Sequence, residues 1–221
     1  MRGTFANIRI KNEMVPGIEG GFTHHFQTDQ PEPIFDVAMR YKKEHTPQIL
    51  IAGKEYGTGS SRDWAAKGVA LLGVKAVIAE SFERIHRTNL VGMGVLPLQF
   101  DPGTTAESLG LDGSELIDIP ALADRLGVAG RVEALVHRTD GTITTVPLTI
   151  RLDTEEDVEY WRHGGILPLV WRDYVHGNFE EHVSHSARPV QGDAASMQQH
   201  ELPDAMPASD VPSSAQGVSL S

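Results

Sequence analysis

The stretch at residues 48–79 reads QILIAGKEYGTGSSRDWAAKGVALLGVKAVIA. It opens on a short apolar run, passes through a glycine-rich loop, and then carries apolar residues at helical spacing before a second apolar run. Short apolar runs that are rich in branched residues and flanked by glycine are typical of buried strands. The stretch therefore predicts a strand, a loop, a helix and a second strand, which together form the repeating unit of a parallel sheet.

The same alternation extends to both sides of this unit. Residues 33–44 and 82–91 have apolar side chains at helical spacing, and residues 95–100 form a third apolar run. Beyond residue 110 the pattern changes to β, with a hairpin turn expected at Asp140-Gly141. The further elements expected there are strands at 116–119, 131–137 and 142–152, and a closing helix from Asp153, as its N-cap, to Gly164-Gly165. The prediction is a mixed α/β domain with an added antiparallel layer.

The composition changes at residue 176. Residues 176–221 are rich in Ser, Ala, Gln and Pro, and they contain six acidic residues, one basic residue and a single aromatic residue. With so few large apolar side chains, the segment cannot offset the entropy lost on ordering. We therefore predict a folded domain at residues 1–175 and an acidic, disordered tail at residues 176–221.

The overall composition excludes several classes of protein. The 221 residues carry a formal net charge of −11, which disfavours nonspecific binding to nucleic acid. No apolar run is long enough to span a bilayer, and residues 1–7 lack the apolar core of a signal peptide, so a cytoplasmic location is expected. The chain contains no cysteine, so any iron–sulfur cluster associated with it must be held by thiolates of another chain or domain.

The glycine-rich loop is the strongest candidate for a functional site. It lies between a strand and a helix, where unpaired backbone N–H groups favour an anion. Gly57 and Gly59 allow positive φ angles and a close approach of the backbone to a ligand. Ser60 and Ser61 add two hydroxyl groups, and Arg62 adds a guanidinium group suited to carboxylates. The pattern indicates a site for a small polyanion.

Two other interpretations of this loop remain open from the residues alone. Ser60 followed by Asp63 is a capping-box pattern, so the serine could simply end the helix. A strand, a Gly-x-Gly loop, a helix, a strand and then Glu80 also echo a dinucleotide-binding unit. Against the dinucleotide site, Arg62 stands where the third glycine would be required.

Four blocks of the sequence together resemble one known family. The run AGKEYGTGSSRDWAAKG at residues 52–68 resembles the signature of the fourth, swivelling domain of aconitases, and residues 80–94 resemble the block that follows it. Residues 2–9 and 163–167 are similar to the opening and closing segments of that domain. The resemblance covers roughly residues 1–175 and favours the branch of bacterial aconitase A and the iron-regulatory proteins.

The resemblance implies a fold and an activity. The fold would be the swivelling β/β/α domain of the aconitase C-terminal type, which is also the type of the isopropylmalate isomerase small subunit. The activity would be that of a hydro-lyase interconverting citrate and isocitrate by dehydration and rehydration. Ser60 would be the catalytic base, and Arg2, Ser61 and Arg62 would bind substrate carboxylates.

The family's [4Fe-4S] cluster would lie on a partner. The expected partner is a cluster-bearing large subunit, or the three preceding domains of a longer chain, so this chain is expected to be inactive alone. The alternatives are a noncatalytic RNA-binding or regulatory module of the same family and a specificity for 2-methylcitrate.

Some weaker signals favour structural roles. The adjacent His24 and His25 should point apart, which disfavours a shared metal site. Arg84, His86 and Arg87 form a small basic cluster that fits a solvated helix face better than a cleft wall or a domain contact. Near the end of the domain, aromatic residues are expected to pack in the interior rather than to stack on bases, namely Trp161, Trp171 and Tyr174.

Overall fold

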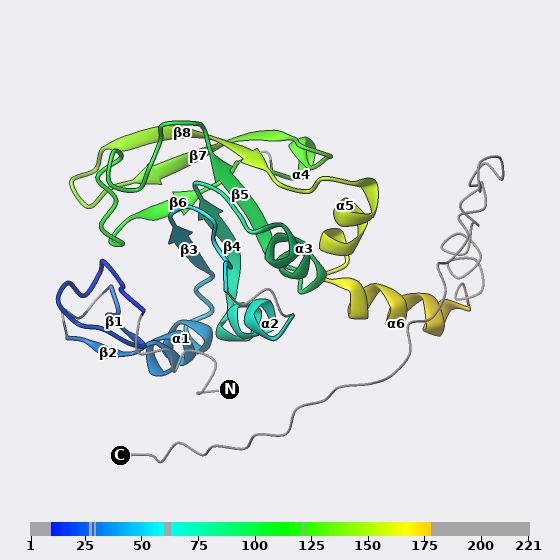
Figure 1. Ribbon diagram of the computed structural model, residues 1–221, viewed down its shortest axis with the longest axis horizontal. Helices are drawn as coiled ribbons and strands as arrows, with labels where there is room; N and C mark the ends of the chain where they lie inside the picture. Colours follow the sequence, from blue (N-terminus) through cyan, green and yellow to red (C-terminus); the bar gives the residue numbers. More distant parts are fainter. Residues whose placement is uncertain (1–9, 27, 29, 60–62, 121, 178–221) are drawn as a thin grey trace, which may run out of the picture. The chain divides into compact units, whose positions relative to one another are not determined.

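The computed structural model describes residues 10–26, 28, 30–59, 63–120 and 122–177 (Figure 1). The predicted tail, apart from His176 and Gly177, lies outside these residues. The predicted α/β alternation is present at the centre of the fold. It comprises β3 (Gln48–Ala52), α2 (Asp63–Leu72), β4 (Val74–Ala79), α3 (Arg84–Gly92) and β5 (Leu96–Phe100).

One six-stranded sheet organises the domain, in the order β3-β4-β5-β8-β7-β6. The first three strands are parallel, and each remaining pairing is antiparallel. The antiparallel half consists of β6 (Leu116–Asp118), β7 (Arg131–His137) and β8 (Ile143–Ile150). In the hairpin between β7 and β8, Gly141 has φ +85° and the Thr142 amide donates to Asp140 Oδ1 at 2.8 Å. The mixed α/β fold, its antiparallel layer and this turn were all predicted from the sequence.

Residues 10–33 form an irregular segment ahead of the sheet. It contains a two-residue antiparallel pair, β1 (Phe22–Thr23) with β2 (Glu32–Pro33), which the sequence analysis did not predict. Its polypeptide leads directly into α1 (Ile34–Lys43), for which Pro33 is the N-cap. A short helix, α4 (Leu122–Arg125), precedes β7 and was also not predicted. Within the described residues, none of the helices combines the length and the apolar character needed to cross a bilayer.

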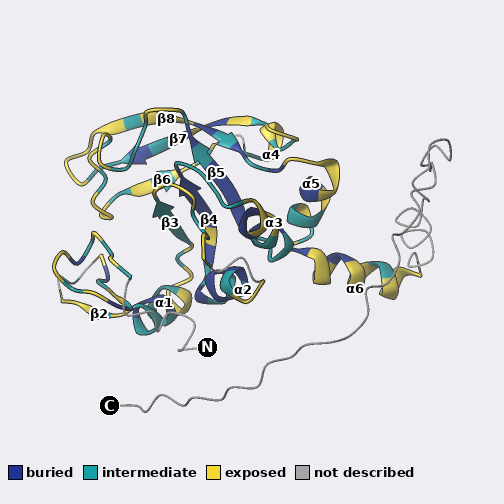
Figure 2. Cartoon of the chain, viewed as in Figure 1, coloured by how far each residue is buried: buried dark blue, intermediate teal, exposed yellow. Residues whose placement is uncertain are grey.

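The two faces of the parallel half support two separate clusters of buried side chains. Val77 faces α2 and α3, where it packs with Ala66 and Leu90. Its neighbour Ile78 faces the opposite side and packs with side chains of β5, β7 and β8, as the alternation of side chains along a strand requires. In Figure 2, β5 is drawn mostly in the buried colour, whereas buried and exposed residues alternate along β7 and β8. The curled sheet therefore shields its own inner face, while α2 and α3 cover the other.

The end of the domain differs from the prediction. Helix α5 (Glu155–Arg162) is capped by Thr154, whose hydroxyl accepts a hydrogen bond from the Asp157 amide at 3.1 Å, so Asp153 is not the N-cap. The predicted stop at Gly164-Gly165 is correct, and both glycines have positive φ angles. The folded chain continues beyond these glycines, however. A further helix, α6 (Ile166–His176), follows and ends at Gly177 in the left-handed conformation.

Helix α6 presents exposed apolar side chains. Leu167 is 74% exposed, and Trp171 and Tyr174 are each 66% exposed. The rings of Trp171 and Tyr174 stack on each other with centroids 6.0 Å apart. The expectation that these two aromatic residues pack in the interior is therefore wrong.

A buried ion pair fastens α3 to the segment that leads into α5. The Arg87 guanidinium donates to Asp157 Oδ2 at 2.9 Å and to the Arg151 carbonyl at 2.9 Å, and its Nε lies 3.2 Å from Asp153 Oδ2. Arg87 and Asp157 are both buried. The interpretation of Arg84, His86 and Arg87 as a solvated helix face is therefore wrong for Arg87. A helical pattern on its own does not reveal that a partner 70 residues away covers one of its faces.

We predict that replacing Asp157 with alanine lowers the free energy of unfolding by about 3–5 kcal/mol, because a buried guanidinium loses its main counter-charge. Urea denaturation of the full chain measures this loss. The matched control is Asp101→Ala, which removes the 2.7 Å partner of the largely exposed Arg131 and should cost far less. Equal losses for the two variants would contradict a structural role for the Arg87–Asp157 pair.

Candidate active site

The four predicted site residues lie outside the described part of the chain. These are Arg2, Ser60, Ser61 and Arg62. The structure does describe both flanks of the central three, namely the loop at residues 53–59 and α2 from Asp63 onward. The structure therefore describes the segments on either side of residues 60–62 in the sequence.

The glycine loop is fastened to the connection between β4 and α3. The Tyr56 amide donates to the Ser81 carbonyl at 2.9 Å, and the Glu83 amide donates to the Tyr56 carbonyl at 2.9 Å. The Glu80 amide donates to the Gly53 carbonyl at 3.2 Å, and the Glu55 amide donates to Ser81 Oγ at 2.7 Å. These four hydrogen bonds continue the pairing of β3 with β4 past the ends of the strands. The loop thus lies at the carboxyl edge of the parallel strands, where α/β sheets commonly bind ligands.

Two glycines of the loop have positive φ angles, but the space around them differs. Gly57 has φ +97°, and a Cβ atom there would lie 2.2 Å from Cγ of His86. Gly59 has φ +86°, and a Cβ atom there would meet nothing within 4 Å. The prediction of positive φ angles is confirmed at both positions. The close approach that Gly57 permits is to the His86 ring, which the sequence analysis did not anticipate.

His86 is buried directly behind the loop. His86 is only 2% exposed to solvent. Within the described residues, neither ring nitrogen has a hydrogen-bond partner. Burial lowers the pKa of His86, with a smaller opposing effect from the Glu83 carboxylate. Burial therefore favours the neutral imidazole, and the expectation of a solvated basic cluster is wrong for His86 as well as for Arg87. No sequence signal distinguished it from the exposed Arg84, because both lie at the start of one helix.

Other side chains complete the frame around His86. The Tyr56 ring lies edge-on to the His86 ring, with 5.1 Å between centroids, and burial raises the pKa of Tyr56 to about 12. At the start of α3, a Glu83 carboxylate oxygen accepts a hydrogen bond from the His86 amide at 2.7 Å. This hydrogen bond is the largest reason why the pKa of Glu83 is lowered. The loop therefore packs against the buried rings of His86 and Tyr56, and the N-terminus of α3 is capped by Glu83.

Helix α2 begins directly after the undescribed segment. Asp63 is its first residue, and an oxygen of that carboxylate lies 3.0 Å from the Trp64 amide. The first amides of a helix carry a partial positive charge and lack partners within the helix. Residues 60–62 thus connect the glycine loop to a helix N-terminus, as the anion-site interpretation requires. The capping-box alternative, which depends on Ser60, falls outside the described residues.

No metal site forms within the described residues, since no group of three or more His, Cys, Asp or Glu side chains is close enough to share an ion. His25 is buried, stacks on the Tyr41 ring at 4.4 Å, and lies 3.2 Å from Glu44 Oε2. Its place in this cluster accords with a structural role rather than with a metal site shared with His24.

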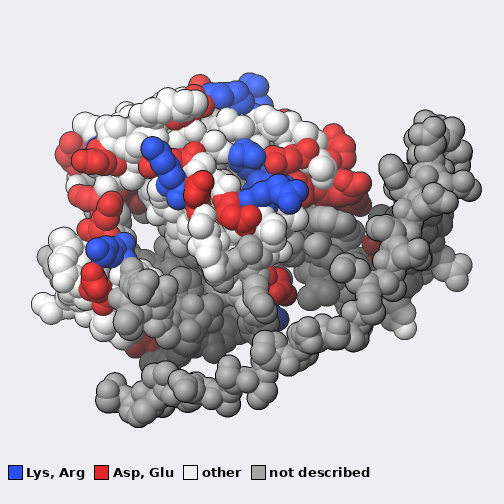
Figure 3. Space-filling model, viewed as in Figure 1, with Lys and Arg blue, Asp and Glu red and all other residues white. Residues whose placement is uncertain are grey.

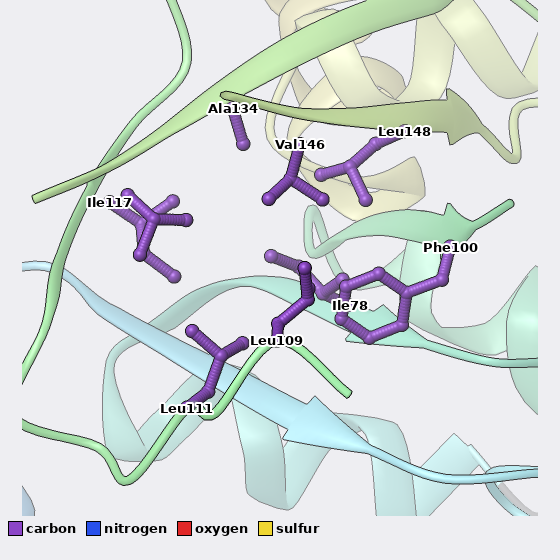
Figure 4. Close-up of a pocket in the computed structure, with 9 residues that line it drawn as sticks. Ile78, Phe100, Leu109, Leu111, Ile117, Ala134, Val146 and Leu148 are labelled. Carbon is purple, nitrogen blue, oxygen red and sulfur yellow. The ribbon is translucent and has the colours of Figure 1, made fainter. Parts of the chain in front are cut away.

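The pocket in Figure 4 is a poorer candidate for a binding site than the glycine loop. It lies inside the curled sheet and is lined entirely by apolar side chains, among them Ile78, Phe100, Leu109, Val146 and Leu148. It offers no hydrogen-bond donor to orient a polar ligand. We interpret it as a packing gap of the core.

Comparison with known proteins agrees with the sequence resemblance. Residues 1–103 match the family model of the aconitase C-terminal domain. Aconitate hydratase A of Legionella pneumophila is 58% identical over 172 residues, which cover 78% of this chain and 19% of the relative. Aconitate hydratase A of Escherichia coli K12 is 57% identical over 175 residues, which cover 79% of this chain and 20% of the relative. The chain spans about a fifth of the length of these curated relatives.

A solved structure of 3-isopropylmalate dehydratase from Methanocaldococcus jannaschii aligns with 66% of this chain and 82% of its own, with a TM-score of 0.39 and 18% identity. That likeness is too low to carry an argument. The match of the family model and the identities above 50% carry the assignment. Residues 1–103 of this chain thus match the aconitase C-terminal domain family, and the chain is similar to the C-terminal-type segment of curated aconitate hydratases A.

Proposed function

We propose that this chain is the swivelling domain of an aconitate hydratase-type hydro-lyase. In this proposal Ser60 is the catalytic base, and Arg2, Ser61 and Arg62 bind substrate carboxylates. The observation that supports it is the hydrogen-bonded glycine loop and the N-terminus of α2, which flank residues 60–62 in the sequence, in a chain whose residues 1–103 match the aconitase C-terminal domain. The substrates are hydroxy-tricarboxylates as a class, which include citrate, isocitrate and 2-methylcitrate.

The chemistry of dehydration makes two demands on this chain. A proton must leave a carbon next to a carboxylate, and the negative charge on the substrate must be held in place while it leaves. A serine hydroxyl is a weak base unless its alkoxide is stabilised, and helix amides with a guanidinium nearby supply such stabilisation. Arg62 and Arg2 offer paired N–H donors that match carboxylate oxygens in number and spacing.

The chain cannot supply the whole active site. It has no cysteine, so its residues do not fit a [4Fe-4S] cluster, and we assign that cluster to the partner. The partner is the remaining four-fifths of an aconitase-type protein, either as preceding domains or as a separate large subunit. A cytoplasmic location remains part of this proposal.

The alternative of an RNA-binding module has less support. The net charge of −11 opposes binding to a polyanion. On the face shown in Figure 3, acidic and basic side chains of the described residues are interspersed rather than gathered into a basic patch. That face thus lacks the electrostatic footprint that a backbone-binding RNA module requires.

The proposal predicts that the chain alone has no hydratase turnover. Turnover should appear when the chain replaces the matching segment of aconitate hydratase A from Legionella pneumophila. Aconitate formation from citrate and from isocitrate, followed under anaerobic, reducing conditions, measures both preparations. Turnover by the chain alone would contradict the proposal, as would an inactive fusion that is folded and carries its cluster.

In the active fusion, Ser60→Ala should lower kcat on the order of 10²–10⁴-fold with little change in KM, because a general base acts mainly in the transition state. Ser61→Ala is the matched control, and it should raise KM more than it lowers kcat. The two variants are compared by steady-state kinetics with isocitrate. A Ser60→Ala enzyme with near-normal kcat would show that the base lies elsewhere.

The frame behind the loop predicts different costs for two glycine substitutions. Gly59→Ala should lower the free energy of unfolding by about 1–2 kcal/mol, the usual cost of a left-handed alanine. Gly57→Ala carries the same backbone cost and also forces the loop away from His86, so it should lose more stability and also lower kcat in the fusion. Urea denaturation and steady-state kinetics measure the two effects. Equal behaviour of the two variants would mean that the contact between Gly57 and His86 does not position the loop.

A further inference from the structure

Glu55 has a backbone conformation that is uncommon for its residue type. Its φ angle is +51°, in the left-handed region that favours glycine. Within the described residues, His45 and Ala129 are the other non-glycine residues with positive φ angles, and neither belongs to the glycine loop. Residues in such sparsely populated conformations persist only where their surroundings fix them, and they cluster at active sites. The neighbours of Glu55 must therefore hold it in place.

Ser81 supplies this support with its side chain. The Glu55 amide donates a hydrogen bond to Ser81 Oγ at 2.7 Å. The next amide of the loop, that of Tyr56, donates to the Ser81 carbonyl at 2.9 Å. Ser81 lies two residues after the end of β4 and is half-buried. It thus binds two successive amides of the loop, and only the bond to Glu55 depends on the hydroxyl group.

The side chain of Glu55 does not account for the left-handed conformation. Asparagine and aspartate tolerate it because their short polar side chains form local hydrogen bonds, whereas the longer side chain of glutamate is less suited to do so. The Glu55 side chain is exposed. The hydrogen bond to Ser81 therefore provides from outside the support that the residue at position 55 lacks by itself.

The conformation of Glu55 sets the course of the rest of the loop. The Thr58 amide donates a hydrogen bond to the Glu55 carbonyl at 3.0 Å, which closes a turn over residues 55–58. Gly57 and Gly59 follow with φ angles of +97° and +86°. A different φ angle at Glu55 would redirect this turn, because the turn is built on the Glu55 carbonyl. Ser81 thereby controls the path of the described residues that precede position 60.

We propose that Ser81 is a positioning residue of the hydro-lyase, whose hydroxyl group keeps Glu55 left-handed and so fixes the path of the glycine loop. This inference rests on the proposed function, in which Ser60 directly follows the loop and acts as the base. A displacement of about 1 Å in an active site can lower a rate on the order of 10²-fold. Ser81 acts through Glu55, and its role requires no contact with the substrate.

The first test uses the chain alone and needs no activity. In the Ser81→Ala variant, the Glu55 amide should exchange with solvent on the order of tenfold faster, because it loses its acceptor. Amide exchange measured by NMR gives this rate. The Glu80 amide, which donates to the Gly53 carbonyl, is the internal control and should exchange as before. Ser81→Thr keeps a hydroxyl group and should preserve the slow exchange at Glu55.

The second test measures steady-state kinetics with isocitrate in the active fusion. Ser81→Ala should lower kcat about 5–20-fold and change KM less, because a misplaced base acts mainly on the transition state. Ser81→Thr should restore most of this loss. A role of Ser81 in folding alone would lower the amount of active enzyme and would not separate kcat, corrected for the folded fraction, from KM.

Substitutions at residue 55 then show whether Ser81 acts through the backbone of Glu55. Glycine adopts a positive φ angle without support, so in a Glu55→Gly background the Ser81→Ala change should lower kcat less than about threefold. The matched control is Glu55→Gln, which removes the charge and keeps the strain, so the full effect of Ser81→Ala should remain. His45→Gly places a glycine at a left-handed position outside the loop and should also leave the full effect.

A variant series at residue 55 replaces these tests if Ser81→Ala does not fold. In the fusion, kcat should fall in the order Glu55→Gly, Glu55→Ala, Glu55→Val, because a branched side chain tolerates a positive φ angle least. A different order would refute the inference.

The outcomes separate this inference from the proposed function. An active fusion in which Ser81→Ala leaves kcat unchanged would refute the positioning role and leave the proposed function standing. Unchanged exchange of the Glu55 amide in the chain alone would do the same, as would equal losses of kcat in the Glu55→Gly and Glu55→Gln backgrounds. A folded, cluster-bearing fusion without turnover would instead refute the proposed function, and the role of Ser81 in that reaction with it.

Discussion

The contact between the glycine loop and the β4–α3 connection is the constraint on which the candidate site depends. Four hydrogen bonds join the segment 53–56 to residues 80–83, so the loop is an extension of the sheet rather than a free connection. Behind it, the His86 ring occupies the space that any side chain at residue 57 would need. Glycine is required there both for its φ angle and for its missing Cβ. Residues 53–56 are thereby held at the carboxyl edge of the parallel strands.

The burial of His86 belongs to the same constraint. A charged imidazole under the loop would have to be desolvated beside the Tyr56 ring, and this burial lowers the pKa of His86. Its two ring nitrogens have no partner within the described residues, which is costly for a buried polar group. Buried polar groups that remain unsatisfied are uncommon in folded proteins.

The antiparallel half of the sheet and the Arg87–Asp157 pair have a different role. The curled strands bury one face of the parallel half, and the ion pair fixes α3 to the segment before α5. Because α3 carries both His86 and Arg87, the same helix supports the loop on one side and is anchored to the end of the domain on the other. The orientation of the loop is therefore set by contacts that run across most of the domain.

Much of the local structure could be predicted from periodicity. The strand at 48–52, the helix after the loop and the hairpin at Asp140-Gly141 depend on short-range patterns, and each was predicted within two residues of its position. Helix α6 was missed because a paired glycine stop precedes it and because its apolar side chains face away from the domain. His86 and Arg87 were misassigned for a related reason, since burial depends on elements that lie far away in sequence.

The sequence by itself determined the alternation of strands and helices, the family, the candidate residues Arg2, Ser60, Ser61 and Arg62, and the absence of any thiolate for a cluster. These properties depend on residue types and on short spacings along the chain. They can be identified without knowing which residues are in contact. Only the tertiary structure decided which charges are buried, which glycine is irreplaceable, and which helix face is left uncovered. Each of these depends on the distance between residues remote in sequence, and no local pattern encodes such a distance.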